Sequence, residues 1–336
     1  MFTREIKPPL ARPIQNGRPV QGTWTRAFRR LGMTGFRVKE WQSFIIQNDD
    51  VFFEAIIANL KYIRFIEISF LNKKNGMLKY YIDYFPFAFW ELPDSLYDSI
   101  MEYKTLGYSI KIHNYLNKNK FEFIFEIDPL DDLNVFKANF IIYVEEKKWL
   151  PLVTNLLYSE DRYLVSYKTP GRVLGIINTG DGGPFELSPE NTLALVRDSK
   201  GYLPYITKFN NANGFGFDKT GKIIAFSLSE NAARGAKKDN ENALWSGSEL
   251  TPLPPVMITH EEGFEKDWVI EDIEGMIDLS FTPQNQTGKK SFDIILAKAE
   301  LANPIGVFNG MIMTKEGEKI ILRNLPGYVE SIYLRF

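Results

Sequence analysis

The chain has 336 residues, 44% of them hydrophobic and 24% charged, and its 40 basic and 42 acidic side chains leave a formal net charge of −2. This near balance gives no support to nucleic-acid binding. The absence of cysteine excludes disulfides, thiolate nucleophiles and cysteine-ligated metal sites, and two histidines are too few for a three-histidine metal centre.

The N-terminal segment, residues 1–20, is rich in proline and arginine, which predicts an extended arm laid over the body of the protein. It contains no apolar core of a signal peptide, and no stretch of the chain approaches the roughly 18 apolar residues that a membrane helix needs. We therefore expect a cytoplasmic protein with no transmembrane segment.

Strand-like segments rich in isoleucine and phenylalanine follow the arm. Two of them flank the turn 72–76, with the sequence NKKNG, and this pattern indicates a hairpin. In 121–127 phenylalanine alternates with acidic residues, which is the period of a strand with one buried face. The strands expected in the first half are 51–60, 62–71, 77–84, 108–116, 121–127 and 135–144.

The second half of the chain repeats this pattern. Helix signals are limited to two short segments, 94–101 and 188–197. The second of these opens with Ser188 before Pro189, the pattern of an N-cap followed by proline at the first helical position. The strands expected in this half are 222–227, 276–281, 292–299, 305–313, 319–323 and 328–336.

The spacing of these elements bounds the fold class. Many short strands with few helices predict an all-β protein built from barrels or sandwiches. The length fits two domains, and we place the boundary so that residues 21–162 form the first and residues 163–336 form the second.

The strongest candidate for a functional site is the stretch 198–245, where polar side chains lie among aromatic ones. The motifs of nucleotide-binding loops, zinc proteases and serine hydrolases are absent from the sequence. Amides and carboxylates beside large rings are the ingredients of an apolar pocket with a few orienting groups. The candidate catalytic residues are Asp198 and Glu241, and the candidate ligand-binding residues are Tyr202, Tyr205, Thr207, Phe209, Asn211, Asn213, Asn231, Arg234, Asn242 and Trp245.

The same stretch has a plainer interpretation. Asparagine and glycine are turn formers, Glu241 and Asn242 could cap such turns, and Trp245 could be a core residue. Composition alone leaves both interpretations open.

Several short elements follow one another in a characteristic order along the chain. They are Trp41 with the strands of 51–71, then Asp198 with Gly201, Tyr202 and Pro204, then Thr207, 214–221, 241–243, Trp268, 278–283, 306–310, Gly327 and Glu330. Their order and spacing resemble the family known as domain of unknown function 2804, over most of the chain and more closely in its second half. One departure follows Thr207, where tryptophans are expected and this chain has Phe209 and Asn211.

The resemblance implies a fold. The family is similar in architecture to double lipocalin-like barrels, a group that includes carotenoid hydratase-type proteins. It implies two calycin-like antiparallel β-barrels side by side with a few short helices, and a ligand site in a barrel mouth or between the barrels. It does not imply a reaction, because one fold hosts many functions.

Three functions remain open. The first is binding of an apolar or lipid-like small molecule in the interior, oriented by polar groups around Asp198 and Glu241. The second is an isomerase, hydratase or cyclase acting on an isoprenoid-like or polyketide-like substrate, in which burial raises the pKa of one of these carboxyl groups so that it protonates an alkene or enol. The third is a structural or partner-binding protein whose barrels are filled with side chains. We expect no cofactor and no metal.

Overall fold

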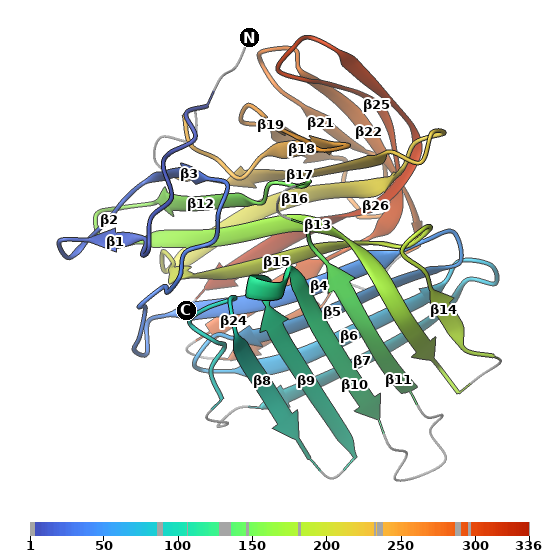
Figure 1. Cartoon of the computed structure of the whole chain (residues 1–336), viewed down its shortest axis with the longest axis horizontal. Coiled ribbons are helices and arrows are strands. Elements are labelled where there is room, and N and C mark those ends of the chain that lie inside the picture. The colour runs from blue at the N-terminus through green and yellow to red at the C-terminus, as the bar shows by residue number, and fades with distance from the viewer. Residues whose placement is uncertain are drawn as a thin grey trace.

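The structure is a computed structural model of the chain, and it describes residues 4–85, 90–105, 107–127, 136–145, 148–180, 183–231, 233, 238–285, 290–294 and 297–335. Two curled antiparallel sheets contain most of these residues and are stacked on each other (Figure 1). The predicted all-β fold is therefore confirmed, and each sheet forms a half-barrel of the double lipocalin-like kind.

The first sheet contains the strands between Gly22 and Tyr202. They are hydrogen-bonded in the order β7-β6-β5-β4-β15-β13-β11-β10-β9-β8, with β14 and β12 beside β13, and β3 beside β12. In Figure 1, β8–β11 run at a steep angle to β4–β7, which shows the curl of this sheet. The strands are β3 (Gly22–Trp24), β4 (Lys39–Gln47), β5 (Val51–Asn59), β6 (Arg64–Asn72), β7 (Met77–Phe85), β8 (Ser99–Lys104), β9 (Tyr108–Tyr115), β10 (Lys120–Ile127), β11 (Phe136–Tyr143), β12 (Leu152–Leu157), β13 (Tyr163–Asn178), β14 (Phe185–Leu187) and β15 (Leu193–Tyr202).

The second sheet begins at Ile206. Its order is β19-β18-β17-β16-β26-β25-β22-β21-β20, with β24 also paired to β26 and β23 paired to β24. The strands are β16 (Ile206–Phe217), β17 (Ile223–Asn231), β18 (Ala243–Ser246), β19 (Glu249–Pro252), β20 (Met257–His260), β21 (Trp268–Glu271), β22 (Ile277–Asn285), β23 (Lys290–Ile294), β24 (Ala297–Ala302), β25 (Ile305–Met313) and β26 (Lys319–Arg335).

The N-terminal arm touches both sheets. A small hairpin of β1 (Ile14–Gln15) and β2 (Arg18–Pro19) lies within it. The amide of Lys7 donates to the carbonyl of Thr23 on β3, whereas Arg4 reaches the segment 240–253 of the second sheet. Strands β13 and β15, which follow residue 162, are hydrogen-bonded within the first sheet. Membership of a sheet does not define a folding unit, so the division into domains at 162 stays a prediction.

Local sequence explains the hairpins. The turn between β6 and β7 ends at Gly76, whose φ of +73° favours glycine over any residue with a side chain. The chain passes from β9 to β10 through the 3-10 helix η1 (Leu116–Lys118) and Asn119, which has a left-handed conformation that asparagine tolerates.

Phenylalanine rings fill the interior of the first half-barrel. The predicted alternation holds in β10, where Phe121, Phe123 and Phe125 are buried and the intervening residues are more exposed. Phe123 stacks on Phe140 with ring centroids 4.7 Å apart, and Phe53 packs edge-on to both. This interior is a dense aromatic core of the kind that stabilises a fold.

The two predicted short helices are wrong. Residues 94–98 are irregular and lead into β8, and residues 189–191 form a single turn before β15. The amides of Asn191 and Thr192 donate to the carbonyl of Ser188, as at a helix start. The apolar residues 193–196 that follow are all buried, because β15 lies in the middle of the first sheet with the second sheet against it, and this burial outweighs the capping signal. Among the described residues η1 is the one helical element.

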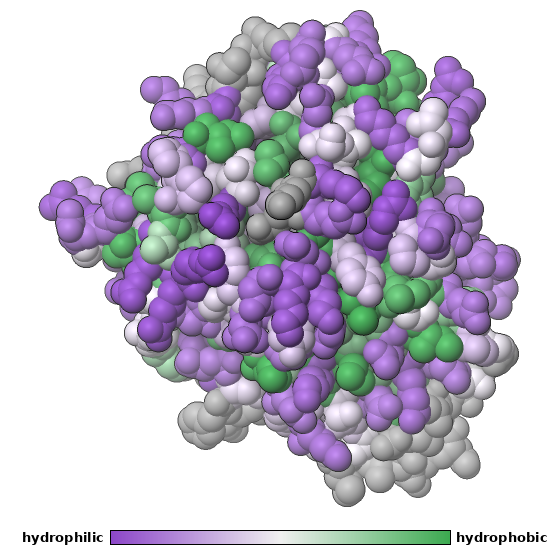
Figure 2. Space-filling model, viewed as in Figure 1, coloured by the Kyte–Doolittle hydropathy of each residue, from purple (hydrophilic) through white to green (hydrophobic). Residues whose placement is uncertain are grey.

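The surface is mixed in character. Figure 2 shows one face on which hydrophilic residues predominate and hydrophobic ones are scattered rather than gathered in one large patch. Within the part of the chain that the structure describes, no helix has the length and apolar composition needed to cross a membrane.

Candidate functional site

The two sheets pack face to face, with β4, β13 and β15 of the first against β16 and β26 of the second. Side chains alternate along a strand, so every second residue of β15 faces the other sheet. Arg197 and Ser199 face this layer between the sheets, whereas Asp198 faces the interior of the first half-barrel. The layer brings together residues that are far apart in the sequence.

An ion pair joins the two sheets in this layer. The guanidinium of Arg197 donates to both carboxylate oxygens of Glu330, at 2.6 and 3.4 Å, and to the hydroxyl of Tyr328 at 2.8 Å. The amide of Asn211 donates to Glu330 at 2.9 Å. Burial alone would lower the pKa of Arg197, but the carboxylate of Glu330 raises it above its usual value. Arg197 therefore stays charged inside the protein.

A second buried ion pair lies nearby. The ammonium of Lys168, from β13, is 2.9 Å from the carboxylate of Glu241 and donates to the hydroxyl of Ser227 at 3.2 Å. Burial lowers the pKa of Lys168 below its usual value, although the charge of Glu241 opposes this effect. A lysine with a lowered pKa is closer to releasing its proton at neutral pH than one in water.

An apolar pocket opens beside the first ion pair. It is a cavity of about 60 Å³ between β4, β5, β6 and β15 on one side and β16, β24 and β26 on the other. Its walls include Phe65, Leu301 and Ile332, and its polar end is formed by Arg197 and Glu330. The pocket thus has an apolar body and one hydrogen-bonding end, as many small-molecule sites do.

A smaller polar chamber adjoins this pocket. It has a volume of about 20 Å³ and is lined by Lys168, Arg197 and Glu241 among others. The hydroxyl of Tyr158 is buried there and has no hydrogen-bond partner among the described residues. Burial and then the charge of Glu241 raise the pKa of Tyr158 above its usual value, so this hydroxyl stays protonated. An unpaired buried hydroxyl is unfavourable and is a ready donor to a bound group.

Two aromatic rings lie where the pocket and the chamber meet. Trp41 on β4 and Phe209 on β16 line both cavities, and their rings are stacked with centroids 6.5 Å apart and planes 20° apart. They are the residues, together with Arg197, that the apolar pocket and the polar chamber share.

Asp198, one of the two predicted catalytic residues, lies apart from Glu241. It lines a cavity of about 20 Å³ inside the first half-barrel, against Phe28, Leu31 and Val165. Burial raises the pKa of Asp198 to about 7, with Lys200 opposing this effect. The structure therefore gives Asp198 the perturbed acidity expected of it, but on the opposite face of β15 from the layer between the sheets.

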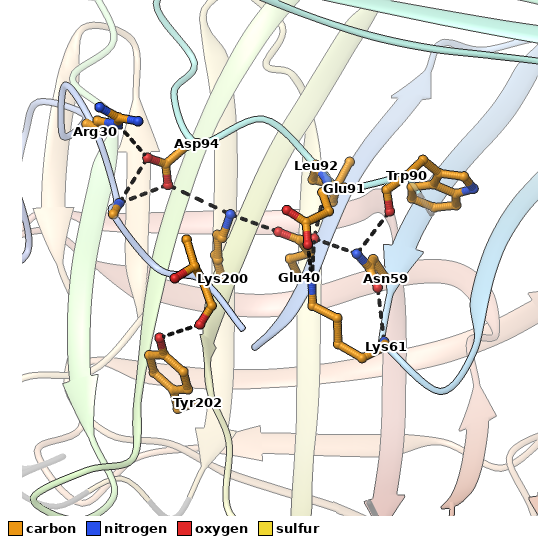
Figure 3. A network of polar contacts seen from close by, with 12 residues as sticks. Arg30, Glu40, Asn59, Lys61, Trp90, Glu91, Leu92, Asp94, Lys200 and Tyr202 are labelled. Atoms are coloured by element: carbon orange, nitrogen blue, oxygen red, sulfur yellow. Dashed lines mark hydrogen bonds and ion pairs between the residues drawn. The ribbon is translucent and has the colours of Figure 1, made fainter. Parts of the chain in front are cut away.

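Figure 3 shows a polar network that includes Glu40 and Lys200, whose charges act on Asp198. Its centre is the buried carboxylate of Glu40, which is 2.9 Å from the ammonium of Lys200 and 3.5 Å from that of Lys61. Asn59 donates to the same carboxylate at 2.7 Å, and Lys200 also lies 3.8 Å from Asp94. The network joins the ends of β4, β5 and β15 to the segment 90–94, which is a structural role.

Three predicted site residues meet in the layer between the sheets, namely Glu241, Phe209 and Asn211. Asn213 follows on β16 and is fully buried, with no hydrogen-bond partner for its side-chain amide among the described residues. Strand pairing places Asn211 at the first ion pair, because it lies opposite Glu330 in the register of β16 and β26.

Three other predicted site residues, Thr207, Asn242 and Trp245, stabilise local structure. The hydroxyl of Thr207 donates to the carbonyl of Pro204 at 3.0 Å. Asn242 accepts from the amide of Ser229 at 2.7 Å and donates to the carbonyl of Pro254 at 2.8 Å, so it ties a turn together. Trp245 is fully buried and its indole donates to the carbonyl of Leu150.

The remaining predicted residues lie elsewhere. The hydroxyl of Tyr202 donates to the carbonyl of Thr34, and Tyr205 is 64% exposed. The backbone of Asn231 pairs with Phe209 at the end of β17, and its side chain lies outside the described part, as does Arg234.

Sequence reasoning missed Lys168, Arg197 and Tyr158 as site residues. A signal for Arg197 was present, because it directly follows the apolar run 193–196 of a strand that is buried on both faces. A charged residue at such a position requires a buried partner. The sequence does not reveal which partner, since Glu330 comes from a strand more than one hundred residues later.

The described residues contain no group of three or more histidine, aspartate or glutamate side chains placed to hold a metal ion. Within the layer, Tyr158 can donate a hydrogen bond, and Lys168 and Glu241 are placed to exchange a proton.

Comparisons with known proteins address family and fold. A family model described as "Domain of unknown function (DUF2804)" matches residues 4–336. No curated protein matches the sequence. Among solved structures, a crystal structure of CghA with Sch210972 is similar, with a TM-score of 0.55, 8% identity and coverage of 89% of this chain and 88% of that one. This likeness shows a shared fold over nearly the whole chain.

Two further solved structures are similar at lower scores. Kievitone hydratase from Nectria haematococca has a TM-score of 0.48 and 11% identity, with 89% of this chain and 88% of that chain covered. A putative AttH from Nitrosomonas europaea has a TM-score of 0.46 and 12% identity, with coverage of 88% and 92%.

Proposed function

We propose that this chain, which belongs to the DUF2804 family as the order of its sequence elements indicated, is a small-molecule-binding protein. Its ligand is an apolar molecule with one neutral polar group, and the binding site is the layer between the two sheets. The observation that carries the proposal is that the apolar pocket and the polar chamber share Trp41, Arg197 and Phe209. A ligand seated there would place its apolar body and its polar group in matching surroundings.

The charges of the site favour a neutral polar group. Arg197 is paired with Glu330, and Lys168 with Glu241, so neither cation is left to neutralise an anionic ligand. The unpaired hydroxyl of Tyr158 offers a hydrogen bond instead. A carbonyl or hydroxyl group meets these conditions better than a carboxylate or phosphate.

The size of the site sets a further condition. The cavity of about 60 Å³ is well below the roughly 300 Å³ of a typical ligand pocket. Binding of a whole ligand therefore requires side chains of the layer to move, and the rings of Trp41 and Phe209 are placed where their movement would join the pocket to the chamber. Side-chain rotation of half-buried rings is a motion of low energetic demand compared with opening a sheet.

Native mass spectrometry of the purified protein tests the proposal first, together with titration of the neutral fluorescent probe N-phenyl-1-naphthylamine. We expect either a co-purified apolar molecule or saturable probe binding. Replacement of Ala299 by leucine should weaken that binding, because the added methyl groups enter the apolar pocket that Ala299 lines.

Two tyrosine variants provide a matched comparison for the polar end of the site. Tyr158→Phe removes the unpaired hydroxyl, and we expect it to weaken binding of a ligand with a carbonyl or hydroxyl group by about 5- to 10-fold, the effect of one hydrogen bond. Tyr205→Phe makes the same chemical change at an exposed position and should have no effect. If A299L binds the probe as well as the unaltered protein does, the ligand does not occupy this layer.

A second candidate function is acid–base catalysis on such a molecule, of the isomerase, hydratase or cyclase kind. The favouring observation is the contact between Lys168, whose pKa burial lowers, and the carboxylate of Glu241 beside the same chamber. Turnover of a co-purified molecule that is abolished by Glu241→Gln would support this function. Turnover abolished by Asp198→Asn and not by Glu241→Gln would instead place the reaction in the first half-barrel.

A further inference from the structure

A cavity larger than the apolar pocket and the polar chamber lies in the first half-barrel, away from the layer between the sheets. Its volume is about 380 Å³, which is within the range of small-molecule sites. It lies between β6 and β7 on one side and β9 and β10 on the other, and shares no lining residue with the apolar pocket or the polar chamber. Nothing in the proposed function uses this cavity.

Aromatic rings form much of its wall. Tyr81, Tyr108 and Phe125 line it, and Ile66 and Ile68 lie at its apolar base. The rings of Tyr108 and Phe125 have centroids 6.1 Å apart and are tilted by 47°. The tyrosine rings are partly exposed while Phe125 is buried, so the wall faces both the interior and the solvent.

The same wall continues beyond the cavity through further rings. Tyr103 lies 6.1 Å from Tyr108, and Phe85 lies 4.7 Å from Tyr103, as centroid distances. Phe85 and Tyr81 come from alternate positions of β7, so they project from the same face of that strand. Asp83 stands between them on this face.

Asp83 is the one charged side chain among the described residues that line the cavity. In the described part of the chain no lysine, arginine or histidine forms an ion pair with it. Its charge acts on the neighbouring rings: after burial, it is the next cause that raises the pKa of both Tyr103 and Tyr108. The carboxylate therefore lies at an aromatic wall, and no cation among the described residues forms an ion pair with it.

We propose that this cavity binds an organic cation, an amine or a quaternary ammonium compound, with its charge between Asp83 and the rings of Tyr81 and Tyr108. A cation is attracted by the electron-rich face of an aromatic ring and by a carboxylate at the same place. The methyl or methylene groups of such a ligand also bury apolar surface against Phe125 and the isoleucines. An anion would be repelled by Asp83, and a metal ion would lack a second carboxylate ligand here.

Calorimetric titration with choline and with its neutral isostere 3,3-dimethyl-1-butanol separates the charge from the shape of the ligand. We expect choline to bind and the isostere to bind at least about fivefold more weakly, because it lacks the cation–π and ion-pair attraction. Benzyltrimethylammonium, which adds an aromatic ring, should bind more tightly than choline. Raising the sodium chloride concentration should lower the affinity for both cations, because Asp83 is exposed and salt screens its charge.

Two variants locate the binding. Asp83→Asn should remove the preference for choline over its isostere, whereas Asp278→Asn, at an exposed position on β22, should leave it unchanged. Tyr108→Leu keeps an apolar side chain but removes the ring. It should weaken the binding of the two cations more than the binding of the isostere. If either variant unfolds, which circular dichroism would reveal, the other still tests the site.

The proposal is overturned if neither cation binds, or if choline and its isostere bind equally to the unaltered protein. It is also overturned if Asp83→Asn retains the full preference for choline. This outcome is distinct from failure of the proposed function, because Asp83→Asn should not change binding of N-phenyl-1-naphthylamine between the sheets.

Discussion

The guanidinium of Arg197 on β15 meets the carboxylate of Glu330 on β26 at 2.6 Å, and the two side chains are only 9% and 6% exposed. One partner belongs to the first sheet and the other to the second, so the pair ties the half-barrels together. Tyr328 and Asn211 complete its hydrogen bonds. The polar end of the apolar pocket therefore also holds the two sheets together.

We predict that Glu330→Gln lowers the free energy of unfolding by about 3–5 kcal/mol, because it leaves the Arg197 charge buried without its partner. Urea unfolding followed by circular dichroism measures this change. The double variant Arg197→Met with Glu330→Leu should be destabilised less than Glu330→Gln, since no buried charge remains.

An exposed ion pair provides the control for this prediction. Arg37 and Asp161 lie 3.4 Å apart with side chains 62% and 68% exposed. Asp161→Asn should change the free energy of unfolding by less than about 1 kcal/mol, because water screens such a pair. Equal effects of Asp161→Asn and Glu330→Gln would mean that the buried pair does not hold the sheets together.

The acidity of Asp198 predicts a pH dependence of stability. Its pKa is raised from 3.8 to about 7, because burial disfavours the charged form. The folded state then binds this proton more tightly than the unfolded state does. The contribution of Asp198 to the free energy of unfolding is therefore greatest below about pH 4. It falls as the pH rises from about 4 to 7 and does not change above that.

Asp198→Asn tests this dependence, because the amide is neutral at every pH. Relative to the unaltered protein, the variant should gain stability between pH 4 and pH 8, by about 1 to 4 kcal/mol at about 1.4 kcal/mol for each unit of pKa shift. Asp267→Asn makes the same chemical change at an exposed position and is the control for the substitution itself. A flat difference for Asp198→Asn would mean that this carboxyl group is solvated in the folded protein.

The contacts of Arg4 indicate that the N-terminal arm stabilises the segment 240–253. Its guanidinium donates to the carbonyl groups of Asn240, Asn242 and Leu253, at 2.9, 3.3 and 2.7 Å, and to the side chain of Asn240. Glu241 lies between two of these residues. Arg4→Ala should lower stability by about 1–3 kcal/mol, because buried carbonyl groups lose their donor.

Hydrogen exchange locates the effect of Arg4→Ala. Protection of amides in 240–254 should fall more than protection in β10, which Arg4 does not touch. Arg4→Lys should recover little, because an ammonium group cannot reproduce the fork of a guanidinium. Arg12→Ala, an exposed arginine of the same arm, is the control and should leave exchange in 240–254 unchanged.

The sequence was sufficient for elements whose structure depends on local patterns. The turn at 72–76 has glycine where the backbone needs it, and alternation in 121–127 marks a half-buried strand. It was misleading where distant contacts decide. We expected two strands at 319–323 and 328–336, but β26 is continuous, because a bulge at Asn324 and close packing of Gly327 on β16 accommodate the residues that looked like a break.

The site residues, like the strands, could be predicted where they are local in sequence and not where distant contacts bring them together. Phe209, Asn211 and Glu241 are close in sequence and were identified by composition. Arg197 and Lys168 join them through the stacking of two sheets, which no local pattern records. Asp198 was predicted beside Glu241, but the alternation of β15 turns it to the opposite face, since its neighbour Arg197 faces the second sheet.

The stacked rings of Trp41 and Phe209 predict how the site opens. Both line the apolar pocket and the polar chamber, so removal of one ring should join the two cavities. We predict that Phe209→Ala increases the affinity for N-phenyl-1-naphthylamine while lowering stability by about 1–3 kcal/mol, less than for a fully buried phenylalanine because Phe209 is half-buried.

Phe217→Ala is the matched control, because Phe217 lies on the same strand and is also half-buried but lines neither cavity. It should lower stability to a similar extent without changing probe affinity. The difference between the two variants then reports the cavity rather than the loss of packing. If both variants change affinity alike, the rings do not separate the pocket from the chamber, and entry to the site must use another route between the sheets.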